Sequence, residues 1–242
     1  MRFTQIQEFI RFKAYKTRNY CRNYGLWKSI LHFFECLGFT FKNLELVLFE
    51  INIDDTSFTQ KNENTIDLAR VEKEDIENAK EYLDEWFSRD NALKRLEKGH
   101  LLFVVKDGDK MIFYQWVELK EVSIPFIDLS FSIPDDKAYM AYIYTVPDYR
   151  GKGIASKAKP FILKHLQENG YRKVFLAIAP DNLPSIRVNK KAGFKEYQTV
   201  LYRRFLFLKY YCVTDYNTNL RKVSLSIRGT DQHLWKIFSK TD

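Results

Sequence analysis

The segment that most restricts how this chain can fold is residues 141–170, AYIYTVPDYRGKGIASKAKPFILKHLQENG. Its apolar, tyrosine-rich run stops at Pro147, because proline has no N–H to donate to a sheet ladder. Gly151 and Gly153 lack a Cβ, which lets the backbone turn tightly and approach a ligand closely. The helical pattern that begins near Gly153 presents free amides and the positive end of its dipole. The segment therefore predicts a strand, an anion-binding turn and a helix.

The turn also carries two cations, Arg150 and Lys152. A helix dipole contributes only ~0.3–1 kcal/mol per exposed interaction, so amides and cations must act together, which suits a diphosphate better than a lone carboxylate. A dinucleotide fold needs G-x-G-x-x-G, but Ser156 stands at the third glycine, and the triphosphate loop G-x-x-x-x-G-K-S/T is missing from the sequence. A structural glycine turn without a ligand remains an open alternative.

Composition excludes few functional classes. The 242 residues are 45% hydrophobic and 16% aromatic, so the chain can bury a core and is not wholly disordered. The net charge of +8 fits an anionic partner and fits ordinary solubility equally well. Residues 201–211, LYRRFLFLKYY, mix basic and aromatic side chains, but alternating strand faces explain this mixture and no RNA-binding signature accompanies it. We therefore expect no nucleic-acid partner.

The cysteines and histidines predict neither disulfides nor a metal site. Three cysteines without a C-x-x-C pair do not make a disulfide framework. Four histidines are scattered without ligand spacing. No run approaches the ~18 apolar residues of a spanning helix, and the first residues carry charges that a secretory signal core does not have. We expect a reduced, cytoplasmic protein.

Residues 1–43 differ from the rest of the chain in their strongly basic composition. Within them, apolar residues from Leu26 to Leu37 recur near helical spacing, and Gly38 can end the helix. An aromatic amphipathic helix in a basic segment fits a membrane interface. It fits packing on its own domain at least as well, because periodicity does not show what covers an apolar face.

The remaining pattern alternates strands and helices. The predicted elements are a strand at 44–54, a strand at 65–71, one or two helices within 74–99, a hairpin at 100–120 around Asp107-Gly108, strands at 138–146 and 171–179, a short helix within 180–194, and later strands at 197–213 and 222–227. A polar linker lies between the first two strands.

Two motifs in the sequence resemble those of a known protein family. VPDYRGKGIA, residues 146–155, resembles the acyl-CoA-binding motif of the GCN5-related N-acetyltransferases (GNAT), Gln/Arg-x-x-Gly-x-Gly/Ala, with Arg150, Gly153 and Ala155 in register. DNLPSIRVNKKAGF resembles the family's later helix, matched by Asn182, Ser185, Gly193 and Phe194. The two motifs stand at the family's separation, and the resemblance covers about residues 64–200.

The resemblance implies an α/β (α+β) fold with a mixed, splayed central sheet flanked by helices. We expect this domain at 44–210, a basic helical extension at 1–43 and a β-rich extension at 211–242. It also implies acetyl-CoA as the acyl donor. The implied cofactor-binding residues are Thr145, Val146, Arg150, Gly151, Lys152, Gly153, Ile154, Ala155, Asn182 and Ser185, although Asn182 would also serve as a plain helix cap.

The implied reaction is direct attack of an amine on the thioester. The tyrosine that the family often uses as acid, seven residues after the Asn, is Asn189 here, and the strand at 138–146 holds no carboxylate. Glu118 and Tyr144 are the candidate bases; the carbonyl would be polarised by an amide near Val146. The acceptor is a small-molecule amine, with an amino sugar or cell-envelope precursor favoured. The alternative is a catalytically weak or inactive acyl-CoA-binding or interaction module. A peripheral membrane contact through residues 1–43 is compatible with either reading. The sequence predicts no oligomeric state.

Overall fold

The structure is a computed structural model that describes residues 41–54, 67–77, 89–108, 110–205 and 208–226. The chain divides into two compact units: residues 45–200, 213–222 and 230–242 form the larger, and residues 1–44, 201–212 and 223–229 the smaller. The predicted helix at 26–37 and the linker after the first strand lie outside the described residues. The predicted domain boundaries at 43/44 and 210/211 stay a prediction.

The larger unit is built on a mixed sheet. Its strands are β1 (Phe41–Asn52), β2 (Leu68–Val71), β3 (Leu101–Asp107), β4 (Lys110–Glu118), β7 (Lys137–Thr145), β8 (Lys173–Ile178) and β9 (Lys195–Phe205). Their spatial order is β9-β1-β8-β7-β4-β3-β2. The β7–β8 pair is parallel, whereas β1–β8, β2–β3, β3–β4 and β4–β7 are antiparallel. The predicted mixed sheet is confirmed.

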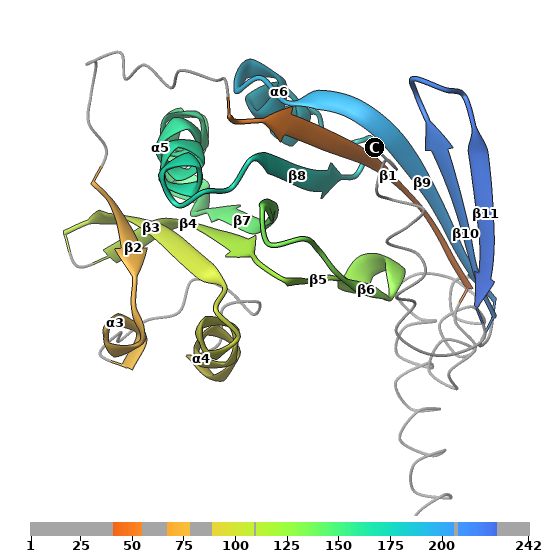
Figure 1. Ribbon diagram of the computed structural model, residues 1–242. Coiled ribbons are helices and arrows are strands. Elements are labelled where there is room, and N and C mark those ends of the chain that lie inside the picture. Colours follow the sequence, from red (N-terminus) through yellow and green to blue (C-terminus); the bar gives the residue numbers. More distant parts are fainter. Residues whose placement is uncertain (1–40, 55–66, 78–88, 109, 206–207, 227–242) are drawn as a thin grey trace, which may run out of the picture. The chain divides into compact units, whose positions relative to one another are not determined.

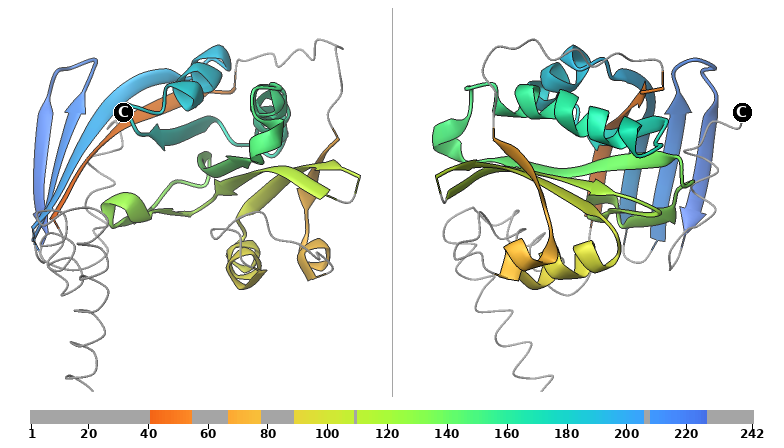
Figure 2. Two further views of the ribbon diagram at one scale, coloured as in Figure 1. Left: turned by 180° about the vertical axis from the view of Figure 1, so that it is seen from behind. Right: turned by 60° about the vertical axis from the view of Figure 1, so that its left-hand side comes forward.

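Four helices within the described residues accompany this sheet: α3 (Lys73–Glu77), α4 (Arg89–Glu97), α5 (Ile154–Glu168) and α6 (Leu183–Lys191). α5 covers one face of β7, β4 and β3, and α3 and α4 lie against the opposite face (Figure 1). The two further views show the same two layers (Figure 2). α5 and α6 contact each other.

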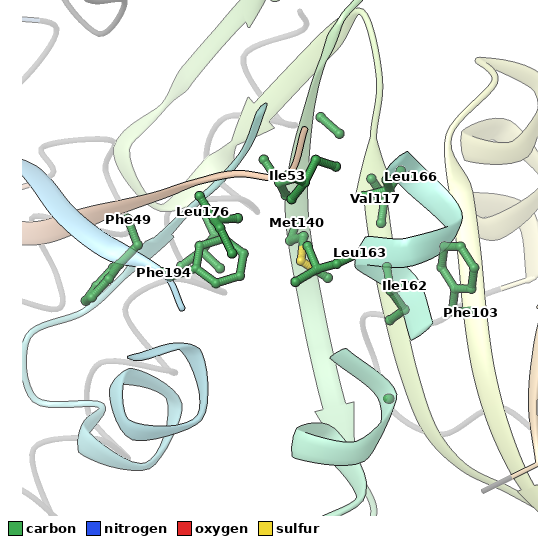
Figure 3. Packing of buried hydrophobic residues seen from close by; sticks show 14 of the residues in the cluster. Phe49, Ile53, Phe103, Val117, Met140, Ile162, Leu163, Leu166, Leu176 and Phe194 are labelled. Atoms are coloured by element: carbon green, nitrogen blue, oxygen red, sulfur yellow. The ribbon is translucent and has the colours of Figure 1, made fainter. Parts of the chain in front are cut away.

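The core of the larger unit lies between α5 and the sheet. Ile162, Leu163 and Leu166 are fully buried on one face of α5. They pack in one cluster with Phe103 and Met140 of the strands (Figure 3). Burying such a side chain contributes about 1.5–3 kcal/mol, so these positions fix how α5 sits on the sheet.

One sheet was not expected from the sequence. β5 (Glu121–Ile124) and β6 (Leu129–Ser132) follow β4 and precede β7 along the chain, and they form a separate two-stranded sheet. The 3-10 turn Pro125–Ile127 joins them. Each strand has four residues, and Pro125 and Pro134 border them, so the pattern is too short to distinguish from a loop.

The smaller unit is rich in strands, as predicted for the C-terminal region. It holds the end of β9 and most of β10 (Leu208–Asp215) and β11 (Arg221–Ser226), which follow β9 in the strand order. Tyr202 and Tyr211 are fully buried there, with ring centroids 5.1 Å apart. An aromatic pair of this kind contributes about 0.5–1.5 kcal/mol beyond the area that it buries.

Candidate active site

The turn after β7 has the geometry of an anion site. The short turn Pro147–Tyr149 is followed by two glycines in the left-handed region, Gly151 and Gly153, each at φ 76°. Gly153 is the N-cap of α5 and has no side chain to cap it. The first turn of a helix has amides without an intrahelical acceptor, and the amide of Lys157 is bonded to the Gly153 carbonyl. The amides of residues 154–156 are therefore available to an anion.

Both predicted cations lie at this turn. Arg150 donates from Nε to the Thr145 carbonyl at 3.0 Å, which ties the guanidinium to the end of β7. The Lys152 ammonium lies 4.5 Å from the centroid of the Tyr149 ring. The Tyr149 hydroxyl in turn donates to the Asp107 carboxylate at 2.6 Å, so the turn is anchored to the β3–β4 hairpin.

The strands β7 and β8 part beside the turn. They pair in register from Lys137 to Tyr139 on β7, opposite Lys173 to Phe175 on β8, and the rest of β7 has no registered partner on β8. The cause lies on the other side of β7, where the pairing with β4 shifts between Gln115 and Trp116. Such a bulge bends its strand. The predicted splay of the sheet is confirmed.

Tyr142 is the extra residue of the bulge. Gln115 is opposite Ile143 and Trp116 is opposite Ala141, which leaves Tyr142 unpaired. Its φ of 31° is a conformation that costs an aromatic residue about 1–3 kcal/mol. The buried Gln115 amide donates to the Ala141 carbonyl and thus replaces a lost ladder bond. The bulge is therefore held in place by a side chain.

One amide at the end of β7, expected from the sequence to be free, is already hydrogen-bonded. The Val146 amide donates to the Ile112 carbonyl of β4 at 3.0 Å and is not available to polarise a thioester. Hydrogen-bonded and non-bonded pairs alternate along an antiparallel ladder. Thr145 and Ile143 accordingly direct their amides away from β4, into the gap that β8 leaves.

The polar residues at the start of α6 form hydrogen bonds within the helix. The Asn182 side chain accepts from the Ser185 amide at 3.3 Å, so it caps the helix. Asn189, buried one turn later, donates to the Ser185 carbonyl at 2.9 Å. The Asn189 side-chain oxygen is buried without a hydrogen-bond partner in the described part of the chain. The capping role of Asn182 is established, and cofactor contacts by Asn182 and Ser185 stay a prediction.

Glu118, a candidate base, is buried and paired. One carboxylate oxygen lies 3.2 Å from a guanidinium nitrogen of Arg95 in α4, and the other accepts the Ser123 amide at 2.8 Å. Burial raises the pKa of Glu118, and the Ser123 amide and Arg95 oppose that rise. The same guanidinium lies 4.1 Å from the centroid of the Tyr142 ring, so Glu118 helps to hold the bulge.

Tyr144 of β7, the other candidate base, is half-buried and lies opposite Tyr114 of β4, away from the Glu118 end of that strand. Its ring stacks on Tyr114 at 5.7 Å, and Arg150 lies 5.7 Å from its centroid. Tyr114 and Glu118 are four residues apart on β4, or about 13 Å. The structure places Glu118 and Tyr144 on one face of the sheet and does not bring them together.

Sequence reasoning missed Lys159. It lies on the buried face of α5 and is only 2% exposed. Its ammonium lies 3.7 Å from the Met140 sulfur and 5.7 Å from the centroid of the Phe194 ring. Burial lowers the pKa of Lys159 to about 7. The sequence did contain a signal, because this lysine interrupts the apolar face of α5 three residues before Ile162.

Comparison with known families agrees with this geometry. The family model of the GNAT acetyltransferases matches residues 64–194, more than half of the chain. The chain belongs to this family. The resemblance found in the two motifs is thereby confirmed. No curated protein matches the chain.

Solved GNAT structures resemble the chain only distantly. A GNAT-family protein from Novosphingobium aromaticivorans is 13% identical, with a TM-score of 0.47 over 67% of this chain and 64% of that one. A GNAT-family acetyltransferase from Colwellia psychrerythraea is 18% identical (TM-score 0.45, 66% and 56%). A GCN5-related N-acetyltransferase from Sphaerobacter thermophilus is 16% identical (TM-score 0.46, 74% and 56%). The chain thus spans less than two thirds of the length of each, and no functional conclusion follows at these TM-scores.

Two further observations concern only the described part of the chain. It contains no group of three or more His, Cys, Asp or Glu side chains placed to hold a metal ion. None of its helices has the length and apolar character needed to cross a membrane.

Proposed function

We propose that this GNAT protein is an N-acyltransferase that uses acetyl-CoA and transfers the acetyl group to a primary amine by direct attack. The observation that carries the proposal is the parting of β7 from β8 next to an uncapped helix N-terminus. A strand edge with free amides is thus followed directly by an anion-binding turn. A ligand with an amide-containing arm next to a diphosphate requires these two features in this order.

The turn would hold the pyrophosphate of the cofactor. The amides of residues 154–156 supply donors, and Arg150 and Lys152 supply charge. The amides of Thr145 and Ile143 suit the arm, because they point into the gap beside β7. In the same gap an amide of β7 can polarise the thioester carbonyl, which is where negative charge develops during attack.

An amine acceptor must lose its proton before it attacks. A lysine-like amine has a pKa near ~10.4, so about one molecule in a thousand or fewer is uncharged at pH 7. Glu118 and Tyr144 remain our candidate bases. Glu118 acts as a base only when one of its two present contacts, with Arg95 or Ser123, opens. Tyr144 is the more accessible of the two and would act through a water molecule.

The acceptor class that we favour is a small amine such as an amino sugar or a cell-envelope precursor. Tyr142 and Tyr144 are partly exposed on this part of the sheet; Arg95 stacks on Tyr142, and the buried Tyr114 stacks on Tyr144. Aromatic faces suit the apolar faces of sugars and the cationic form of amines. These aromatic side chains therefore support a class of acceptor.

Calorimetric titration with acetyl-CoA tests the cofactor. We expect the wild-type protein to bind and Gly153→Glu to lose binding. The new carboxylate would repel the pyrophosphate, and a non-glycine residue at this positive φ would strain the turn. Gly170→Glu is the matched control: Gly170 ends the same helix at φ 85°, far from the turn. No binding by the wild type, or equal binding by all three proteins, would refute the cofactor site.

A second candidate is a module that binds acyl-CoA without turning it over. Asn189 favours it, since a carboxamide cannot deliver a proton as a phenol does. Thiol release measured over a broad panel of amines separates the two candidates. Release above the rate of acetyl-CoA alone supports the transferase, and tight binding without release supports the module.

A further inference from the structure

Lys159 is the ionisable group whose position the proposed function does not yet explain. A lysine is almost never fully buried unless its ammonium is paired. Among the described residues, the hydrogen-bond partner of this ammonium is the thioether of Met140, a weak acceptor. Burial alone lowers the pKa of Lys159 to about 7, and no charged group of the described residues adds to that shift.

The position of the ammonium is specific. Met140 directly follows Tyr139, the last residue of β7 that pairs with β8, so the ammonium lies at the closed end of the gap. Its other neighbour, Phe194, donates its amide to the Asn189 carbonyl at 3.1 Å. Lys159 is thus beside the end of α6, where the family's usual acid would stand.

The arm of the cofactor would approach this point from the turn. From Val146 back to Ala141, β7 spans about 17 Å at 3.3 Å per residue. An arm that pairs with Thr145 and Ile143 runs along this edge toward the closed end, and its sulfur is the last atom to enter. Glu118 pairs with Tyr139 at the same level of the sheet but on the opposite face.

We propose that Lys159 is the proton donor to the sulfur of coenzyme A, in the place that Asn189 leaves vacant. This role rests on the proposed function. As the amine nitrogen bonds to the thioester carbon, the carbon–sulfur bond breaks and sulfur keeps the electron pair. The Lys159 ammonium gives its proton to that sulfur and becomes a neutral amine. The proton that the attacking amine loses restores the ammonium through solvent.

The proton affinities agree with this direction. A thiol has a pKa near ~8.5, above that of the buried Lys159, so transfer to the thiolate is downhill. An ordinary surface lysine, with a pKa near ~10.4, would hold its proton too tightly. The neighbours of the ammonium among the described residues are Met140 of β7 and Phe194, which precedes β9, and neither side chain titrates.

The test measures the thiol of bound coenzyme A and needs no acceptor. Ultraviolet absorbance of the thiolate is followed against pH in complexes of coenzyme A with the wild type, Lys159→Met and Lys164→Met. We expect the pKa of the bound thiol to be lower in the wild type than in Lys159→Met, because an N–H of the lysine amine can donate to the thiolate and a methionine cannot. Lys164, exposed on the same helix, is the control and should match the wild type.

The outcomes separate the two proposals. Failure of all three proteins to bind coenzyme A would refute the proposed function, and this role with it. Binding with the same thiol pKa in the wild type and Lys159→Met would refute the role of Lys159 alone. A methionine fits an apolar site in place of a lysine, so loss of folding is not expected; circular dichroism of each variant checks this.

A second readout uses turnover with any amine that the acceptor panel identifies. Lys159→Met should lower kcat by about 10²-fold with little change in KM for acetyl-CoA. The wild-type rate should fall as the pH rises above about 7, where Lys159 loses its proton, and the variant should lack this limb. An acetyl group found on Lys159 by mass spectrometry would show that it acts as a nucleophile and would overturn the proposed role.

Discussion

Two buried ionisable residues, on opposite faces of one sheet, are stabilised in different ways. Glu118 keeps a counter-charge in Arg95 and a donor in the Ser123 amide. Lys159 has neither, and its pKa falls instead. A buried group without a partner usually neutralises because its desolvation cannot be offset. At the residue scale, then, Glu118 supports the bulge and Lys159 holds an exchangeable proton.

Lys159→Met should stabilise the protein in a pH-dependent way. Because the folded pKa of about 7 lies below the unfolded value, the penalty of charging Lys159 is full below pH 7 and is relieved as the pH rises toward about 10.5. The gain in free energy of unfolding over the wild type should therefore shrink by about 3 kcal/mol between about pH 6 and pH 9.5. Urea unfolding across this range measures it; a gain that does not vary with pH would contradict the burial of a titrating amine.

Glu118→Gln should lower the free energy of unfolding by about 2 kcal/mol at pH 7, because the partly buried Arg95 loses its counter-charge. The exposed pair of Lys98 and Glu121, at 3.3 Å, is the control: Glu121→Gln should change stability by less than about 0.5 kcal/mol. Equal effects of the two substitutions would show that burial does not strengthen the Arg95 pair. A loss in kcat of more than about 10²-fold, without a matching loss of stability, would identify Glu118 as the base.

At the scale of elements, β7 and α5 form the site together. The bulge at Tyr142 opens β7 toward β8, and Gly153 starts α5 where the strand ends. Neither feature depends on the other locally. Their combination places a strand edge and a helix N-terminus in line, and α5 also carries Lys159 to the closed end of the gap.

The two glycines that bound α5 allow its N-terminal role to be tested. A Cβ at Gly153 or at Gly170 would meet no atom within 4 Å, and both have positive φ. Gly153→Ala and Gly170→Ala should therefore each lower stability by about 1–2 kcal/mol through backbone strain alone. Only Gly153→Ala should also weaken acetyl-CoA binding, by about tenfold or more. Thermal unfolding and calorimetry measure the two effects, and equal binding by both variants would contradict the role of the turn.

At the scale of the whole molecule, the net charge of +8 is concentrated in residues 1–43, which contain eight lysines and arginines and only two acidic residues, Glu8 and Glu35. Residues 1–40 of this segment lie outside the described residues, so its membrane contact stays a prediction. A basic, aromatic segment binds anionic lipid through charge and apolar burial together.

Vesicle flotation tests that contact. The full chain should float with vesicles rich in anionic lipid and be released by salt, because the charge term is screened. Trp27→Asp should abolish flotation, since Trp27 belongs to the predicted apolar face, and Ser29→Asp adds the same charge on the polar face as a control. If both variants float as the wild type does, the apolar face does not contact the membrane.

Much of this protein could be predicted from its sequence because the decisive chemistry is local. Pro147, Gly151 and Gly153 impose the end of a strand and a turn whatever surrounds them, and Asn182 caps the helix that it precedes. The Asp107-Gly108 hairpin follows from the same local rules and is confirmed. Family membership followed from two such motifs at a fixed separation.

The tertiary structure decided what depends on residues far apart in the chain. The bulge at Tyr142 is a matter of register between β4 and β7, which no local pattern contains. The pairing of Glu118 with Arg95 joins a strand to a helix 23 residues earlier in the chain. The burial of Lys159 beside Phe194 exists only because α5 lies on the sheet next to α6. Periodicity shows that a helix has a buried face, but only packing decides which polar group on that face loses its water.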